Sequence, residues 1–314
     1  MIAFGPIPSR RLGVSLGINN IPGSKTCSYS CVYCQVGASL QYSITRRLCY
    51  APELILSEVE KLLNKTSDSV TPDYLTFVAN GEPTLDINLG KAILLLKSLG
   101  IPVAVITNAS LLSNDSVCED LCLADWVSVK ADAADETSWR KINRPHKGID
   151  FTRHLQGLLH FAKHFPNKLQ TETMLAAGFN DQPEILENTA ETIYKINPAT
   201  AWISIPTRPP AVKQVKAPVS EIINQAYQIF SEKGIPTKLI LGFEGTETGF
   251  TGVIEEDILN ICAVHPIRED TMQELLKKNQ ADNSVLDKLL KEEKIQHLRY
   301  NNHSFYLRKH PKAI

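Results

Sequence analysis

Three cysteines, Cys27, Cys31 and Cys34, occur within eight residues in the spacing CxxxCxxC. Thiolates are soft ligands that suit iron–sulfur clusters, zinc or Cu(I). A structural zinc site normally closes with a fourth ligand, and the other four cysteines form no compact second pair. Three thiolates on a four-iron cluster leave one iron open to chelate a small molecule, so this spacing favours such a cluster. A zinc site or three buried thiols is the alternative.

Two arginines follow other apolar runs. Arg144 lies in the run 139–145, and Arg208 lies in the run 207–210, which contains two prolines. Guanidinium groups bind carboxylate or phosphate in a forked geometry. We therefore treat both as substrate-binding candidates, against the alternative of surface arginines on proline-stiffened loops.

Short apolar runs alternate with helical segments along the first 250 residues, which is typical of parallel βα units. We expect six such units and one extra strand in a partial barrel over residues 1–250, with a cluster loop at 20–40. Ligands of such a sheet lie at the carboxyl ends of its strands. Pro6 and Pro8 exclude a helix before Gly13, so we expect that stretch to be irregular. The expected strands are 14–19, 74–79, 103–107, 126–131, 170–175, 202–205 and 237–241, and the expected helices are 52–63, 89–99, 115–123, 151–165, 182–196 and 219–232.

The pattern changes after residue 250. We predict helices over 254–264, 269–277 and 284–292, followed by a β-hairpin over 295–308 that turns at Asn301-Asn302. Helix, helix and hairpin at this size resemble a winged helix. We therefore expect a separate winged-helix-like module over residues 251–314.

Composition narrows the class of protein. The chain has 314 residues, 43% hydrophobic and 21% charged, with a formal net charge of −1, so no global basic field indicates nucleic acid. No apolar run reaches the length of a membrane span, and the first residues do not resemble a signal peptide. These features predict a cytoplasmic protein without membrane contact, whose seven cysteines are reduced thiols or ligands.

The cysteine spacing after a first strand resembles the signature of the radical S-adenosylmethionine superfamily. The resemblance implies an oxidoreductase with a [4Fe–4S] cluster held by Cys27, Cys31 and Cys34, S-adenosylmethionine as cofactor, and a reductant such as flavodoxin or ferredoxin. Residues 80–84 resemble the family's GGEP segment, with Asn80 in place of the first glycine. The cofactor-binding residues that the resemblance implies are Tyr33 near the adenine, Gly81, Glu82 and Pro83 near the amino group, and Asn108, Ser128, Lys130 and Asp132 near the ribose and carboxylate.

A closer resemblance extends over residues 4–245. The segments 4–13, 141–145, 178–181 and 207–210 are similar to those of the wyosine-synthase-related group of iron–sulfur oxidoreductases. Wyosine enzymes modify a guanine in transfer RNA with a catalytic lysine and, in archaeal forms, a second cluster. This chain has no compact second cysteine set before Cys27, so we do not transfer that reaction, and we assign no catalytic residue.

Three classes of function remain open. The basic bias of the C-terminal module favours RNA, including transfer RNA, while an open barrel also admits a peptide or small metabolite. A metal-sensing DNA-binding regulator is the alternative from another class. It has less support, because a regulator needs neither a barrel nor the Gly81-Glu82-Pro83 segment.

Overall fold

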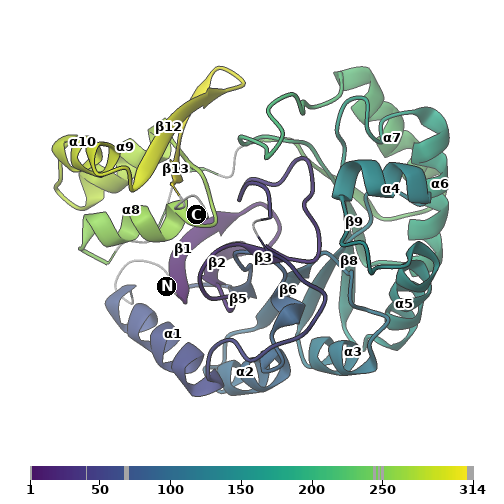
Figure 1. Cartoon of the computed structure of the whole chain (residues 1–314), viewed down its shortest axis with the longest axis horizontal. Helices are drawn as coiled ribbons and strands as arrows, with labels where there is room; N and C mark the ends of the chain where they lie inside the picture. Colours follow the sequence, from purple (N-terminus) through teal and green to yellow (C-terminus); the bar gives the residue numbers. More distant parts are fainter. Residues whose placement is uncertain are drawn as a thin grey trace.

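The computed structural model describes residues 2–39, 41–66, 71–242, 245–246, 248 and 251–309. Its largest element is a curved eight-stranded sheet in the order β1-β2-β5-β6-β7-β8-β9-β10 (Figure 1). All strands are parallel except β1 (Ala3–Ser9), which pairs antiparallel with β2. The parallel strands are β2 (Gly13–Ile18), β5 (Tyr74–Phe77), β6 (Val103–Thr107), β7 (Trp126–Lys130), β8 (Lys168–Met174), β9 (Thr200–Ser204) and β10 (Thr237–Ile240).

Helices connect successive parallel strands and cover the outer face of the sheet (Figure 1). Seven parallel strands and six helical connections confirm the predicted partial barrel of six βα units with one extra strand. The sheet does not close within the described residues, because β1 and β10 form its two edges. The connecting helices are α1 (Pro52–Thr66), α2 (Leu89–Lys97), α3 (Asp115–Cys122), α5 (Phe151–His164), α6 (Pro183–Ile196) and α7 (Ser220–Glu232).

The core of the barrel lies between the sheet and these helices. Leu75, Val105 and Val127 on three adjacent strands are completely buried, together with Val59 and Ile93 of the helices α1 and α2. Fully burying such side chains contributes roughly 1.5–3 kcal/mol each. This packing holds the strands in register and therefore fixes where their carboxyl ends lie.

Two segments differ from the sequence-based expectations. Residues 3–9, which were expected to be irregular, form the strand β1. Proline is tolerated in this strand because β1 lies at the edge of the sheet. The run that contains Arg144 is not simply a loop. It includes the helix α4 (Glu136–Asn143), which is capped by the Asp135 side chain and ends at Arg144 with φ of 45°.

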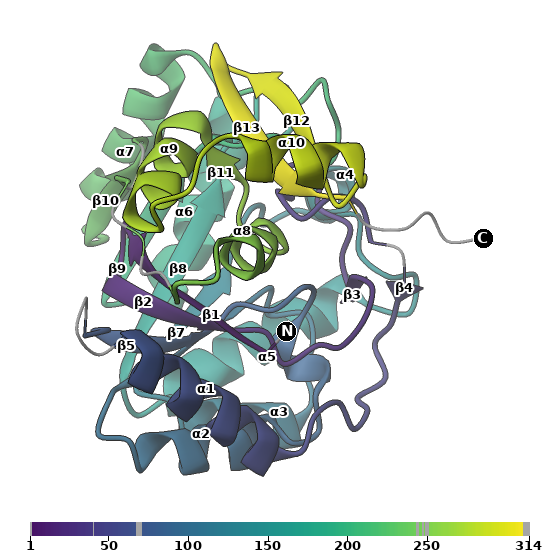
Figure 2. The same ribbon diagram turned by 90° about the vertical axis from the view of Figure 1, so that its left-hand side faces the viewer.

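The C-terminal module, residues 251–309, lies beside β1 of the barrel (Figure 2). It has its own apolar core around Ile258, Met272 and Leu289. Ile7 of β1 packs against this core, so the module adjoins the barrel. The predicted hairpin is confirmed, with positive φ at both Asn301 and Asn302. The module consists of α8 (Ile254–Cys262), β11 (Ile267–Arg268), α9 (Glu269–Lys278), α10 (Ser284–Lys291), β12 (Ile295–Tyr300) and β13 (His303–Arg308), with the sheet order β11-β13-β12.

Candidate active site

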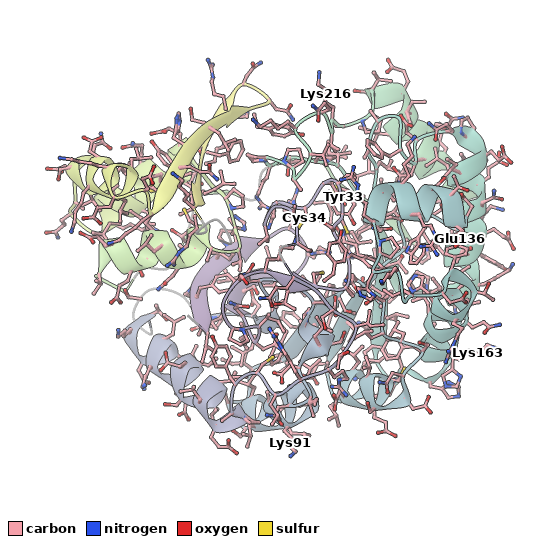
Figure 3. The ribbon with its side chains drawn as sticks, viewed as in Figure 1. Tyr33, Cys34, Lys91, Glu136, Lys163 and Lys216 are labelled. Carbon is pink, nitrogen blue, oxygen red and sulfur yellow. The ribbon has the colours of Figure 1, made fainter. Side chains whose placement is uncertain are left out.

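The three cysteines of the CxxxCxxC motif line one cavity of about 260 Å³. Cys27 ends the short strand β3 (Thr26–Cys27), which pairs with β4 (Gln41–Tyr42), and the loop between them carries the other two cysteines. Figure 3 labels Tyr33 and Cys34 in this loop, near the middle of the molecule. None of the other cysteines lines the cavity, so the structure brings together the three predicted ligands.

The backbone of the cluster loop is fixed against the last turn of α4 and the residues that follow it. The amide of Val32 donates to the carbonyl of Ile142 at 2.9 Å, and the amide of Ser30 donates to the carbonyl of Arg144 at 3.1 Å. The amide of His146 donates back to the carbonyl of Ser28 at 2.8 Å. The segment 142–146 therefore acts as a support for the cysteines.

Each of the three cysteine sulfurs accepts a hydrogen bond from a side-chain N–H group. Such donors stabilise thiolates and adjust the reduction potential of iron–sulfur clusters. The donors are the residue after β6, the last residue of α4 and the residue before β3, so three parts of the fold converge on the motif. The pairs are Asn108 with Cys27 at 3.5 Å, Asn143 with Cys31 at 3.5 Å, and Lys25 with Cys34 at 3.0 Å.

These donors suit a cluster of several irons. Burial raises the pKa of Cys27 to about 12 and that of Cys31 to about 11, so both are protonated thiols until a bound cation displaces their protons. Among the residues that the structure describes, no group of three His, Cys, Asp or Glu side chains is arranged to hold a single metal ion. The three thiols face a cavity of about 260 Å³, which has room for a multi-iron cluster.

The Gly81-Glu82 segment lies directly beside the cluster loop. The amide of Glu82 donates to the carbonyl of Thr26 at 3.1 Å. Gly81 has φ of 142°, and a Cβ there would lie 1.7 Å from the Thr26 oxygen, so a larger residue cannot be accommodated without a backbone shift. Glycine is therefore required for the close approach of β5's end to the motif.

The Glu82 carboxylate is buried and accepts hydrogen bonds from Thr84, Thr107 and Asn108. The distances are 2.7 Å from Thr84 Oγ1, 2.6 Å from Thr107 Oγ1 and 2.8 Å from the Asn108 amide. Burial raises its pKa, whereas these bonds lower it. Glu82 thus joins the ends of β5 and β6 and caps the 3₁₀ turn η1 (Pro83–Leu85).

Asp132, Tyr33 and Asn143 form a buried network. The Tyr33 hydroxyl donates to the Asp132 carboxylate, which also accepts from Asn143 Nδ2 at 2.6 Å and from the Met174 amide at 2.8 Å. Because Asn143 also donates to Cys31, this network links the orientation of Tyr33 to that of a ligand sulfur. Asp132 itself is 3% exposed and does not line the cluster cavity.

Of the remaining residues predicted to bind the cofactor, some line the cluster cavity and others do not. Asn108 and Lys130 line the cavity, and Lys130 pairs with Glu172 at 2.8 Å. Ser128 and Pro83 are buried outside its lining. Glu172 was not singled out from the sequence, yet it also pairs with Arg11, and these cations hold its pKa well below the usual range against the effect of burial.

The structure separates the two arginines predicted to bind substrate. Arg208 lines the cluster cavity, where its Nη1 donates to Gln35 Oε1 at 2.7 Å. Burial, together with the neighbouring charges of Arg10 and Arg11, lowers the pKa of Arg208 to about 9. Arg144 instead lines a shallow depression around residues 144–147, away from the cysteines.

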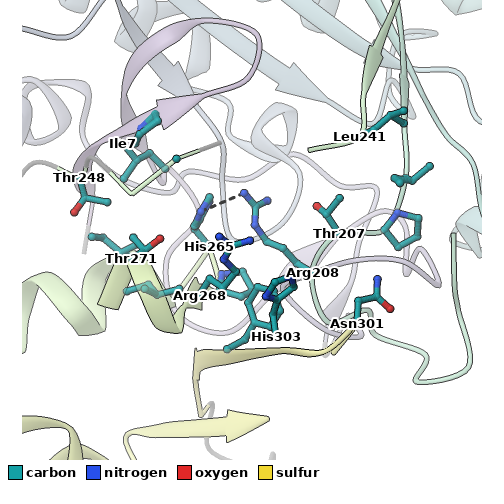
Figure 4. A pocket seen from close by; sticks show the side chains of 18 residues that line it. Ile7, Thr207, Arg208, Leu241, Thr248, His265, Arg268, Thr271, Asn301 and His303 are labelled. Carbon is teal, nitrogen blue, oxygen red and sulfur yellow. Dashed lines mark hydrogen bonds between the residues drawn. The ribbon is translucent and has the colours of Figure 1, made fainter. Parts of the chain in front are cut away.

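A second cavity of about 210 Å³ lies between the carboxyl ends of β9 and β10 and the C-terminal module (Figure 4). It shares residues 205–208 with the cluster cavity. Arg208 contacts His265 of the module at 3.2 Å, and Tyr300 donates to the carbonyl of Pro206 at 3.1 Å. The module therefore contributes a wall next to the site.

The family model described as the Radical SAM superfamily matches residues 21–193, which include all three cysteines and the polar strand ends. The chain belongs to the radical SAM superfamily. This confirms the predicted membership, and with it an S-adenosylmethionine-dependent, iron–sulfur enzyme.

Curated relatives extend the similarity over the whole chain. A UPF0026 protein of Methanocaldococcus jannaschii is 45% identical over 309 residues, covering 98% of this chain and 96% of the relative. A UPF0026 protein of Helicobacter pylori strain J99 is 32% identical over 71% of each chain.

Solved structures show the same fold at low identity. A radical SAM methyltransferase from Sphaerobacter thermophilus has a TM-score of 0.53 and 14% identity, covering 72% of this chain and 66% of that one. SuiB of Streptococcus suis bound to the precursor peptide SuiA has a TM-score of 0.53 and 13% identity over 70% of this chain. This chain covers 48% of SuiB. These comparisons therefore show a shared partial barrel and carry no information about the substrate of this chain.

Among the described residues, no helix is both long enough and apolar enough to span a membrane.

Proposed function

We propose that this protein holds a [4Fe–4S] cluster with Cys27, Cys31 and Cys34 and uses it to cleave S-adenosylmethionine. The observation that carries this proposal is the convergence of three thiols, each with an N–H donor, on one cavity at the strand ends. When bound, the cluster and cofactor supply reductive cleavage to methionine and a 5′-deoxyadenosyl radical.

The residues of the chain have separate tasks in this proposal. Gly81 lets the segment after β5 lie against the cysteine motif, where it would meet the cofactor's amino end, and Glu82 keeps that segment in place through its bonds to Thr107 and Asn108. Tyr33 offers an aromatic face beside the third cysteine, and Asp132 fixes its hydroxyl. Among the cations on the wall, Arg208 is placed to bind a negatively charged part of the substrate.

The test is anaerobic reconstitution followed by reduction with dithionite or a flavodoxin. We expect stoichiometric 5′-deoxyadenosine and methionine from S-adenosylmethionine, and loss of both products in Cys34→Ala. Cys118→Ala is the matched control, because Cys118 does not line the cavity. Equal loss of cleavage in both variants would reject the assignment of ligands.

For the substrate we propose RNA, with transfer RNA as the first to test. The support is the element order of the C-terminal module, which resembles that of a winged helix, together with its contact with the site wall. The number of basic residues in the module overstates the positive charge available to RNA. Lys288, Lys294 and Lys309 each form an ion pair with a glutamate. A peptide or small metabolite that stimulates cleavage while RNA does not would replace this proposal.

Two further parts of the proposal follow from the same features. We divide the chain into a barrel of residues 1–250 and a module of residues 251–314, supported by the separate apolar core around Ile258. A cytoplasmic location fits three cysteines that must remain reduced to bind iron.

A further inference from the structure

Lys25 is an almost completely buried cation in contact with the cysteine motif. Its side chain is 3% exposed, and its Nζ lies 3.0 Å from Cys34 Sγ. The same ammonium also donates to the carbonyl of Gly37, at the other end of the cluster loop. Lys25 therefore lies inside the loop that presents the ligands and is largely shielded from bulk solvent.

Lys25 differs from the other donors to the ligand sulfurs. Asn108 and Asn143 present neutral amides at 3.5 Å, whereas Lys25 presents a full charge at 3.0 Å. The charges that act on Lys25 are those of Cys34, Cys27 and Cys31, whereas the buried carboxylate of Glu82 accepts its hydrogen bonds from Thr84, Thr107 and Asn108. Burying a lysine is costly unless an opposite charge compensates it. The thiolates of the motif are the groups placed to provide that charge.

We propose that Lys25 is a positioning residue that raises the reduction potential of the cluster bound by Cys27, Cys31 and Cys34. This inference rests on the proposed function. Reduction adds one electron, supplied by a reductant of the flavodoxin or ferredoxin class, and makes the cluster and its thiolates one unit more negative. A fixed positive charge at 3.0 Å from a ligand sulfur stabilises the reduced state more than the oxidised state. Net charge and hydrogen bonds to the sulfurs are established determinants of cluster potential.

The experiment is a redox titration of the reconstituted full-length protein, followed by electron paramagnetic resonance of the reduced cluster. In Lys25→Met we expect the equilibrium constant for reduction to fall at least tenfold, which is about 59 mV for one electron. Lys25→Arg, which retains the charge, should recover at least half of that shift. Lys141→Met removes one positive charge from an exposed site and should leave the potential unchanged.

Each result bears on the inference separately from the proposed function. If the wild-type protein binds no four-iron cluster, the proposed function fails. If it binds one and the potentials of Lys25→Met and the wild type agree within twofold in equilibrium constant, the inference alone fails. Loss of iron from both Lys25 variants, with iron retained in Lys141→Met, would assign Lys25 to loop structure and would also overturn the inference.

Discussion

Gln35, the residue after the last cysteine of the motif, donates a hydrogen bond of 2.9 Å to the carbonyl of Val264 in the C-terminal module. Its Oε1 accepts from Arg208 Nη1 at 2.7 Å. A single side chain therefore connects the cluster loop both to the wall of the cavity and to the module. Displacement of the module should therefore move the cluster loop that carries the cysteines.

Replacing Gln35 with Leu should loosen the contact between the loop and the module. Loss of these hydrogen bonds costs about 1–2 kcal/mol, so amides of residues 258–268 should exchange with deuterium roughly tenfold faster. Hydrogen-exchange mass spectrometry measures this rate. Gln296→Leu, on the exposed side of the hairpin, is the control. Unchanged protection of residues 258–268 in Gln35→Leu would mean that the hydrogen bond between Gln35 and Val264 does not stabilise the module.

Replacing a cysteine that lines the cavity should lower the iron content, and replacing any other cysteine should not. The reconstituted protein should bind close to four irons per chain, whereas Cys27→Ala should lose most of them because it removes a whole ligand. Cys122→Ala should retain them, since Cys122 lies on the barrel's outer helix α3. Colorimetric iron and sulfide assays check both variants, and zinc in place of iron would overturn the interpretation of the motif.

Glu82→Gln should weaken cofactor binding and lower thermal stability together. The amide would direct a donor toward groups that already donate to Glu82, and disturbing a charge-assisted hydrogen bond costs about 1.5–3 kcal/mol. Calorimetric titration with S-adenosylmethionine should show at least tenfold lower affinity. Glu136→Gln, an exposed glutamate, should show neither effect. Lower stability with normal affinity would limit Glu82 to a structural role.

RNA binding, if the substrate proposal holds, should depend on the hairpin of the module. Arg299 is exposed on β12, so Arg299→Glu should weaken binding of transfer RNA several-fold and reduce its dependence on salt concentration. Lys163→Glu, on helix α5 away from the module, is the matched charge control. Filter binding over a range of salt concentrations measures both. Equal loss in the two variants would indicate only a general electrostatic attraction.

Stability should fall in mild acid because of His154. This side chain is buried against Trp139, with ring centroids 5.4 Å apart, and burial lowers its pKa to about 4. Between that value and the ordinary 6.5 only the unfolded chain binds the proton, so stability decreases as pH falls through this range. From pH 7 to pH 5 the loss from this group is about 2 kcal/mol. His154→Phe should show a correspondingly smaller loss between the two pH values in urea unfolding, and an equal loss would assign the pH dependence to other groups.

The order of the barrel elements could be predicted because apolar runs and helical periods alternate clearly in the sequence. The strand β1 could not, because Pro6 and Pro8 contradict strand formation unless the strand is known to be at an edge, and that depends on the whole sheet. The helix α4 was missed for a different reason: it spans only eight residues, so its helical period does not stand out, although Asp135 is an N-cap that the sequence carries.

The ligands of the site were predictable, whereas their surroundings were not. Spacing alone identifies the three cysteines, but nothing in the sequence indicates that Lys25, Asn143 and Gln35 contact them or connect them to other elements. Asn143 lies more than 100 positions from Cys31, and only the folded chain brings them together. Lysine is usually exposed, so the burial of Lys25 contradicts the expectation from its type.

The contact of Ile7 with the core of the C-terminal module has a consequence for synthesis. Ile7 belongs to the first strand, while Ile258 of that core emerges from the ribosome about 250 residues later, which takes roughly 10–50 s at ~5–20 residues per second. During that time β1 has an apolar side chain without its final neighbours, although the rest of the sheet can already form. The packing of β1 is therefore completed only when the C-terminal module folds, although β1 is the first strand to be synthesised.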